Sequence, residues 1–158
     1  MARSPYHAAR ETPGSLRELV AGLPQSPPCR VLAVDDNRDT VETLQMLLDA
    51  FGHDTRVAYD GATAIEVARA FRPDVVLLDL AMPAMNGFEV AAQIFELLGS
   101  GNVTIIALTG YGQEADARRT RDAGFSDHLV KPVEPAALAA VLANRCPTPP
   151  SSEPSSEA

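Results

Sequence analysis

Five polar side chains follow short apolar runs of the chain, at the points where those runs end. Asp35 and Asp36 come after RVLAV, Asp79 after DVVLL, Thr109 after VTIIAL and Lys131 after SDHLV. If the runs are parallel strands of one sheet, their carboxyl ends meet at one edge, which is where α/β sheets bind ligands. The sequence therefore predicts that three acids, one hydroxyl and one amine converge on a single site.

The three acids of this site predict a bound cation. Carboxylates that share a site repel one another, so an uncompensated cluster raises its own pKa values or destabilises the fold. A hard divalent cation with oxygen ligands fits best, and Mg²⁺ combines one or two carboxylates with water and phosphate oxygens. We therefore expect Mg²⁺, with Mn²⁺ as the alternative, at Asp35, Asp36 and Asp79. A helix N-cap explains any one of these acids but not the five groups together.

Lys131 is the only lysine of the chain, since the other 12 of its 13 basic residues are arginine. A compact ammonium on a flexible stem acts as a point charge toward a carboxylate or a phosphate, whereas a guanidinium is larger and planar. The choice of lysine thus favours a role at the acidic site. Pro132 follows, and an X-Pro bond at a tight corner is a candidate for the cis form.

Alternating strands and helices are predicted to position these side chains. Five runs have strand length: Arg30–Val34, Asp54–Tyr59, Asp74–Leu78, Val103–Leu108 and Ser126–Val130. Five segments between and after them have helical patterns: Arg38–Phe51, Ala62–Phe71, Asn86–Leu98, Gln113–Ala123 and Pro135–Arg145.

This alternation predicts an α/β fold, with a doubly wound five-stranded parallel sheet between two layers of helices. The runs VLAV, VVLL and TIIAL are continuously apolar, which is typical of strands buried on both faces. The second run, DTRVAYD, mixes polar and apolar residues and is predicted to be an edge strand.

Composition indicates one domain with two short appendages. The chain has 158 residues, of which 46% are hydrophobic and 22% charged, and this suits a single core. Prolines concentrate outside the central part, and the end of the chain is rich in Pro, Ser and Glu. We predict a flexible N-terminal extension at 1–28, a domain at 29–146 and a disordered tail at 147–158.

Net charge and hydropathy exclude several classes of partner. A formal charge of −8 argues against direct nucleic-acid binding, which needs clustered basic residues. Because no apolar run approaches the roughly 18 residues of a membrane span, we expect no membrane insertion and a cytoplasmic location. Cys29 and Cys146 flank the domain and are expected at the sheet edge opposite the acids. In a reducing cytoplasm we expect them as free thiols.

Four motifs together resemble the receiver domains of two-component response regulators. They are VDDN at 34–37, LLDLAMPAMNG at 77–87, ALTG at 107–110 and LVKP at 129–132. Their order, spacing and strand-end placement match that family over about three quarters of the chain. The resemblance implies a flavodoxin-like strand order of 2-1-3-4-5.

The resemblance also implies a role for each site residue. Asp79 is expected to be the phosphoacceptor, receiving a phosphoryl group from a histidine kinase or a histidine phosphotransfer protein. Asp36, Asp79 and the backbone carbonyl of Ala81 are expected to bind Mg²⁺ directly, and Asp35 mainly through water. Lys131 is expected to pair with Asp79 before transfer and with the phosphoryl group afterwards.

The expected output is a phosphorylation-dependent change in the face that binds a downstream protein. Thr109 is expected to hydrogen-bond the phosphoryl group and pull its loop inward. The position that couples to this movement is aromatic in most receivers and is His128 here. We place the movable face on the helix at 113–123 and the elements that follow it.

Other functions fit the sequence less well. A phosphatase of the haloacid dehalogenase class uses an acid two residues after its nucleophile, whereas Ala81 and Asn37 occupy those positions. A phosphorylation-independent scaffold is expected to lack part of the site. We therefore expect a signalling switch with self-phosphorylation and self-dephosphorylation chemistry, not an enzyme. A stand-alone receiver is favoured over the receiver of a hybrid histidine kinase, because the chain begins with Met and its ends have the composition of natural tails.

Overall fold

A computed structural model describes residues 20–83, 86–110 and 117–146 of the chain. Its strands are β1 (Arg30–Val34), β2 (Asp54–Ala58), β3 (Val75–Asp79), β4 (Thr104–Thr109) and β5 (Asp127–Val130). Its helices are α3 (Arg38–Ala50), α4 (Gly61–Phe71), α5 (Gly87–Leu98), α6 (Ala117–Asp122) and α7 (Pro135–Arg145). All ten elements were predicted, and apart from the start of α6 the ends agree within one residue. Residues 113–116 of that predicted helix lie outside the described residues.

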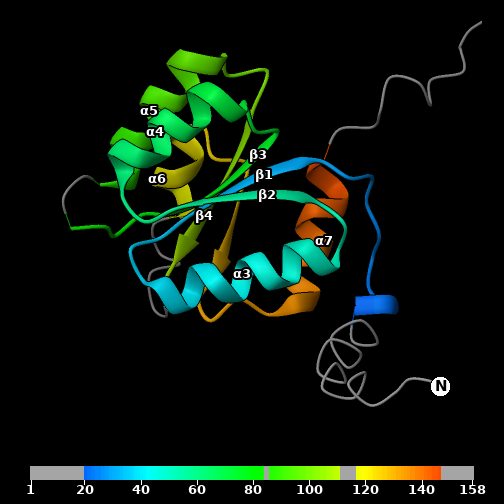
Figure 1. The fold of residues 1–158 in the computed structure, drawn as a ribbon. Coiled ribbons are helices and arrows are strands. Elements are labelled where there is room, and N and C mark those ends of the chain that lie inside the picture. The colour runs from blue at the N-terminus through cyan, green and yellow to red at the C-terminus, as the bar shows by residue number, and fades with distance from the viewer. Residues whose placement is uncertain (1–19, 84–85, 111–116, 147–158) are drawn as a thin grey trace, which may run out of the picture.

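The five strands form one parallel sheet in the order β2-β1-β3-β4-β5. This confirms the predicted doubly wound α/β fold and places β2 at an edge. Figure 1 shows the sheet between two groups of helices, with α3 and α7 on one side and α4, α5 and α6 on the other. The carboxyl ends of all five strands therefore lie at the same edge.

Side-chain alternation along each central strand divides the core into two layers. In β1, Leu32 and Val34 pack with the buried residues of α4 and α5, while Val31 and Ala33 pack with those of α3 and α7. All four of these side chains are completely buried. Burial on both faces is why the central strands read as continuous apolar runs.

Side-chain caps determine where the helices beside the site begin. The Asn37 side chain accepts a hydrogen bond from the Thr40 N–H at 3.2 Å, and the Asn86 side chain accepts one from the Glu89 N–H at 3.0 Å. Each bond satisfies an amide that the first turn of a helix leaves without a backbone partner. As a result α3 begins two residues after the paired acids, and α5 begins beside the end of β3.

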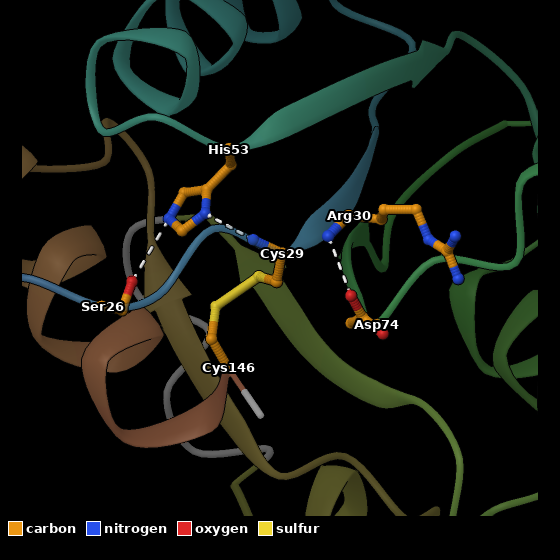
Figure 2. Close-up of a disulfide and its surroundings, with 6 residues drawn as sticks. All are labelled: Ser26, Cys29, Arg30, His53, Asp74 and Cys146. Carbon is orange, nitrogen blue, oxygen red and sulfur yellow. Dashed lines mark hydrogen bonds between the residues drawn. A yellow bond between two sulfur atoms is a disulfide. The ribbon is translucent and has the colours of Figure 1, made fainter. Parts of the chain in front are cut away.

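The two cysteines lie together at the opposite edge of the sheet, as their flanking positions predicted. Cys29 directly precedes β1 and Cys146 caps α7; their Cα atoms are 6.1 Å apart, and the sulfurs are joined as a disulfide (Figure 2). The expectation of free thiols is therefore wrong for this structure, because the two chain ends bring the cysteines within the Cα separation that a disulfide needs. Within residues 20–83, 86–110 and 117–146, no helix combines the length and the hydropathy of a membrane span.

Candidate functional site

Three strand ends bring the predicted acids and the lysine together at the carboxyl edge of the sheet. Asp35 and Asp36 follow β1, Asp79 is the last residue of β3, and Lys131 directly follows β5. One carboxylate oxygen from each of the three acids lies within 4.8 Å of the others. Asp35 and Asp79 are buried and Asp36 is exposed. The predicted convergence of acids and lysine is thus present.

Asp35 is the most firmly held of the three acids. Its Oδ1 accepts a hydrogen bond from the Asn37 N–H at 2.9 Å, and its Oδ2 accepts one from Lys131 Nζ at 3.0 Å. The side chain is completely buried, so both oxygens need such partners in place of water. Lys131 is therefore paired primarily with Asp35.

Asp79 is held more loosely. Lys131 Nζ lies 3.4 Å from its Oδ1, and the Ala81 N–H donates to the same oxygen at 3.1 Å. From the sequence, Asp79 was expected to be the partner of Lys131, but the ammonium lies nearer to Asp35. One ammonium between two buried carboxylates leaves the charge of the pair incompletely balanced.

The pKa values of Asp79 and Lys131 are both shifted at this site. Burial raises the pKa of Asp79 above its ordinary value; the hydrogen bond from Ala81 lowers that pKa, the nearby charge of Asp35 raises it, and the charge of Lys131 lowers it. For Lys131, burial alone lowers the pKa, but the Asp35 hydrogen bond and the charge of Asp79 raise it above its ordinary value overall. The lysine is therefore a permanent cation near neutral pH, and Asp79 is an unusually basic carboxylate.

The donor set fits a hard divalent cation. The strand ends carry three carboxylates, two of which are buried with one ammonium between them. These groups leave net negative charge at this edge of the sheet. Carboxylate oxygens are ligands that Mg²⁺ prefers, and Mg²⁺ retains waters beside one or two of them. Ala81, two residues after Asp79 in the loop to α5, is exposed at this edge.

Thr109 and His128 lie on neighbouring strands beside the acids. Thr109 ends β4, is buried, and its hydroxyl donates a long hydrogen bond of 3.4 Å to the Leu129 carbonyl. His128 lies in β5 opposite Ala107 and is half-buried. The described contacts connect Thr109 to β5 through Leu129, and a switching role for His128 stays a prediction. The peptide bond between Lys131 and Pro132 is cis.

Two features of the site were missed from the sequence. The backbone N–H groups of Asn37 and Ala81 hold the carboxylates of Asp35 and Asp79, each from two residues further along the chain. Gly87 allows α5 to approach the end of β3, since a Cβ there would stand 2.7 Å from the Asp79 carbonyl oxygen. Asn37, the N-cap of α3, is the sequence signal for the N–H group that holds Asp35. The NG pair at 86–87, where α5 begins, is the signal for the close approach of that helix.

Strand order and strand-end acids of this kind are those of receiver-type signalling domains, and comparisons with known proteins agree. The family model for the response regulator receiver domain matches residues 31–143. The chain therefore belongs to the response regulator receiver family, whose members act in phosphorelay signalling.

Two relatives and one solved structure show how far the likeness extends. Protein PilH of Pseudomonas aeruginosa is 34% identical over 105 residues, covering 66% of this chain and 87% of PilH. The DNA-binding response regulator MtrA of Mycobacterium tuberculosis is 38% identical over 111 residues, covering 70% of this chain and 47% of MtrA. The chain thus spans about half the length of MtrA.

The solved structure is a complex from Saccharomyces cerevisiae. It contains the histidine phosphotransfer protein Ypd1 and the receiver domain of its downstream response regulator Ssk1. The likeness to this structure has a TM-score of 0.69 and 26% identity, and covers 76% of this chain and 90% of that chain.

Proposed function

We propose that Asp79 is the phosphoacceptor of this receiver. The observation that carries the proposal is the environment of its carboxylate, which is buried at a strand end, 3.4 Å from one ammonium and beside two further acids. Burial raises the pKa of Asp79, and a more basic carboxylate is a stronger nucleophile. Asp35, with a donor on each oxygen, is held too firmly for that role.

In the proposed reaction an Asp79 oxygen attacks phosphorus in line with the leaving group. The new P–O bond forms as the P–N bond to a donor histidine breaks, and the departing imidazole takes a proton. Asp35, Asp36, Asp79 and the Ala81 carbonyl are the proposed ligands of Mg²⁺, which supplies charge neutralisation for the transferring group when bound.

Lys131 and Thr109 act on the product. Lys131 Nζ already lies between Asp35 and Asp79, so it reaches a phosphoryl oxygen on Asp79 by a small change of side-chain torsions. The Thr109 hydroxyl exchanges its 3.4 Å bond to the Leu129 carbonyl for a shorter, charge-assisted bond to another phosphoryl oxygen. This exchange releases a contact with β5, and His128 is the proposed residue of that strand that moves in response.

The proposed phosphodonor is a phosphohistidine on a kinase or a phosphotransfer protein. The receiver of Ssk1 was solved with such a phosphotransfer protein, and its fold is similar to that of this chain. The proposed output is a protein partner that distinguishes the two states. The proposed unit for both interactions is the domain at 29–146.

The test is to incubate the protein with acetyl phosphate and Mg²⁺ and then to measure its intact mass by mass spectrometry. We expect one phosphoryl group on the wild-type chain, none on Asp79→Asn and none in EDTA. Asp49→Asn is the matched control, because Asp49 is an exposed carboxylate of α3, and it is expected to be labelled like wild type. Equal labelling of Asp79→Asn, or labelling that persists in EDTA, contradicts the proposal.

A further inference from the structure

The strongest cluster outside the acidic site is at the other end of β1. Cys29 and Cys146 are separated by 117 residues in sequence and meet there, and the ring of His53 lies beside them (Figure 2). One ligand atom from each of the three residues lies within 4.8 Å of the others. Receiver chemistry at Asp79 uses none of these groups.

His53 fixes the backbone of the first cysteine. Its Nδ1 accepts a hydrogen bond from the Cys29 N–H at 3.1 Å, and its Nε2 lies 3.4 Å from the Ser26 hydroxyl. Both Cys29 and His53 are buried, and burial lowers the pKa of His53. The ring is therefore neutral near pH 7 and serves as an acceptor that positions Cys29.

A surface groove leads to the pair of cysteines. Cys29 is only 5% exposed, whereas Cys146 caps the last helix and is half-buried. A shallow groove of about 470 Å³ opens beside Cys29 and His53, with Arg30 and Asp74 on its wall. The groove therefore gives a small thiol or disulfide a path to the pair beside Cys29.

The segment before β1, residues 20–28, packs incompletely against α3 and α7. Val20 is buried against the domain, but a cavity of about 220 Å³ remains between the segment, Phe51 at the end of α3 and Leu142 of α7. Incomplete packing leaves residues 20–28 weakly held by noncovalent contacts. A covalent bond at Cys29 fixes the end of the segment to α7.

We propose that Cys29 and Cys146 are a redox-reversible pair whose disulfide tethers residues 20–28 over α3 and α7, at the edge opposite Asp79. The oxidant is a low-molecular-weight disulfide, RSSR. One of the two cysteine thiolates attacks one sulfur of RSSR, forming a mixed disulfide and releasing RS⁻. The other cysteine thiolate then attacks the cysteine sulfur of the mixed disulfide and releases the second RS⁻. Two electrons pass from the cysteines to RSSR, and the two thiol protons end on the released RSH.

The test uses the full chain, reduced and then equilibrated with glutathione and glutathione disulfide in varied ratios. We expect both thiols to be lost together in a monomer, with a Cys29–Cys146 link in peptide maps, and to return as glutathione is raised. The oxidised chain is expected to melt roughly 10 °C above the reduced chain, because the bond closes a long loop in the unfolded state. Hydrogen exchange at residues 20–28 is expected to slow on oxidation.

Serine variants provide the controls. Cys29→Ser and Cys146→Ser are each expected to lose the difference in melting temperature, because neither variant can form the link. Phosphorylation of Asp79 by acetyl phosphate is measured in parallel, so a failed receiver site is distinguished from a failed redox pair.

Four results overturn the proposal. The thiols stay reduced at every glutathione ratio, or disulfides form only between chains. Alternatively, glutathione fails to reduce the bond, or hydrogen exchange at residues 20–28 is the same in the oxidised and reduced chains. A fifth is protection of both thiols by added Zn²⁺ without disulfide formation, which assigns the cluster to metal binding instead.

Discussion

Gly87, the first residue of α5, offers a sharp test of how closely the helix must approach the phosphoacceptor strand. In a Gly87→Ala variant the new Cβ stands 2.7 Å from the Asp79 carbonyl oxygen, 2.7 Å from Leu80 Cα and 2.9 Å from Leu80 Cδ2. The first two neighbours are backbone atoms and cannot rotate away. Ordinary contact begins at 3.4 Å, so α5 or the end of β3 must shift by the difference, 3.4 − 2.7 = 0.7 Å.

The magnitude follows from two opposing effects. Overpacking of this kind costs about 1–3 kcal/mol, and replacing glycine by alanine in a helix offsets at most about 1 kcal/mol of that cost. We expect a net loss of about 1–2 kcal/mol in the free energy of unfolding. With an m value of roughly 2 kcal/mol/M in urea, the unfolding midpoint should fall by about 0.5–1 M.

Urea unfolding followed by far-UV circular dichroism measures this shift, with Gly101→Ala as the matched control. A Cβ at Gly101 meets nothing within 4 Å, so the free energy of unfolding of this variant should stay within about 0.5 kcal/mol of wild type. If Gly87→Ala and Gly101→Ala unfold at the same midpoint, the reasoning about close approach is refuted.

Two further predictions concern the charges of the site, both in metal-free buffer. Burial raises the pKa of Asp79, so the folded state binds the proton of this carboxyl more tightly than the unfolded chain does. Ionised Asp79 therefore lowers the stability of the fold at pH values above the folded-state pKa. This loss of stability disappears at pH values below the unfolded-state pKa. Asp79→Asn should therefore be more stable than wild type at pH 7 by urea unfolding, with an advantage that shrinks as the pH falls toward 4; an advantage that grows instead contradicts the sign. Lys131→Met leaves buried Asp35 without its 3.0 Å partner and should cost about 1–3 kcal/mol, whereas a variant as stable as wild type in the same assay shows that the pair contributes nothing.

Much of the fold was predictable because local and global signals agree. Continuous apolar runs marked β1, β3 and β4 as buried on both faces, and the mixed run at β2 marked an edge. Asn37 and Asn86 are N-cap residues at predicted helix starts. Since parallel strands place their carboxyl ends together, the positions of Asp35, Asp79 and the other site residues followed from the chain order.

What could not be predicted depends on distances across the fold. Which acid Lys131 favours is decided by the difference between 3.0 Å and 3.4 Å, and no spacing in the sequence encodes it. The closeness of Gly87 to Asp79 is likewise a property of helix packing. His53 lies beside the cysteine pair through β2, an edge strand whose loop carries no motif, so its contact with Cys29 was not predicted.

The proximity of the start of β1 and the end of α7 has a consequence for protein engineering. The Cα atoms of Cys29 and Cys146 are 6.1 Å apart, less than two consecutive Cα steps of about 3.8 Å. A short linker can therefore close residues 29–146 into a ring, and new termini can be opened in an exposed turn such as that at Gly101. The same geometry lets the domain be inserted as a cassette into a surface loop of a host protein without separating the strands of that host.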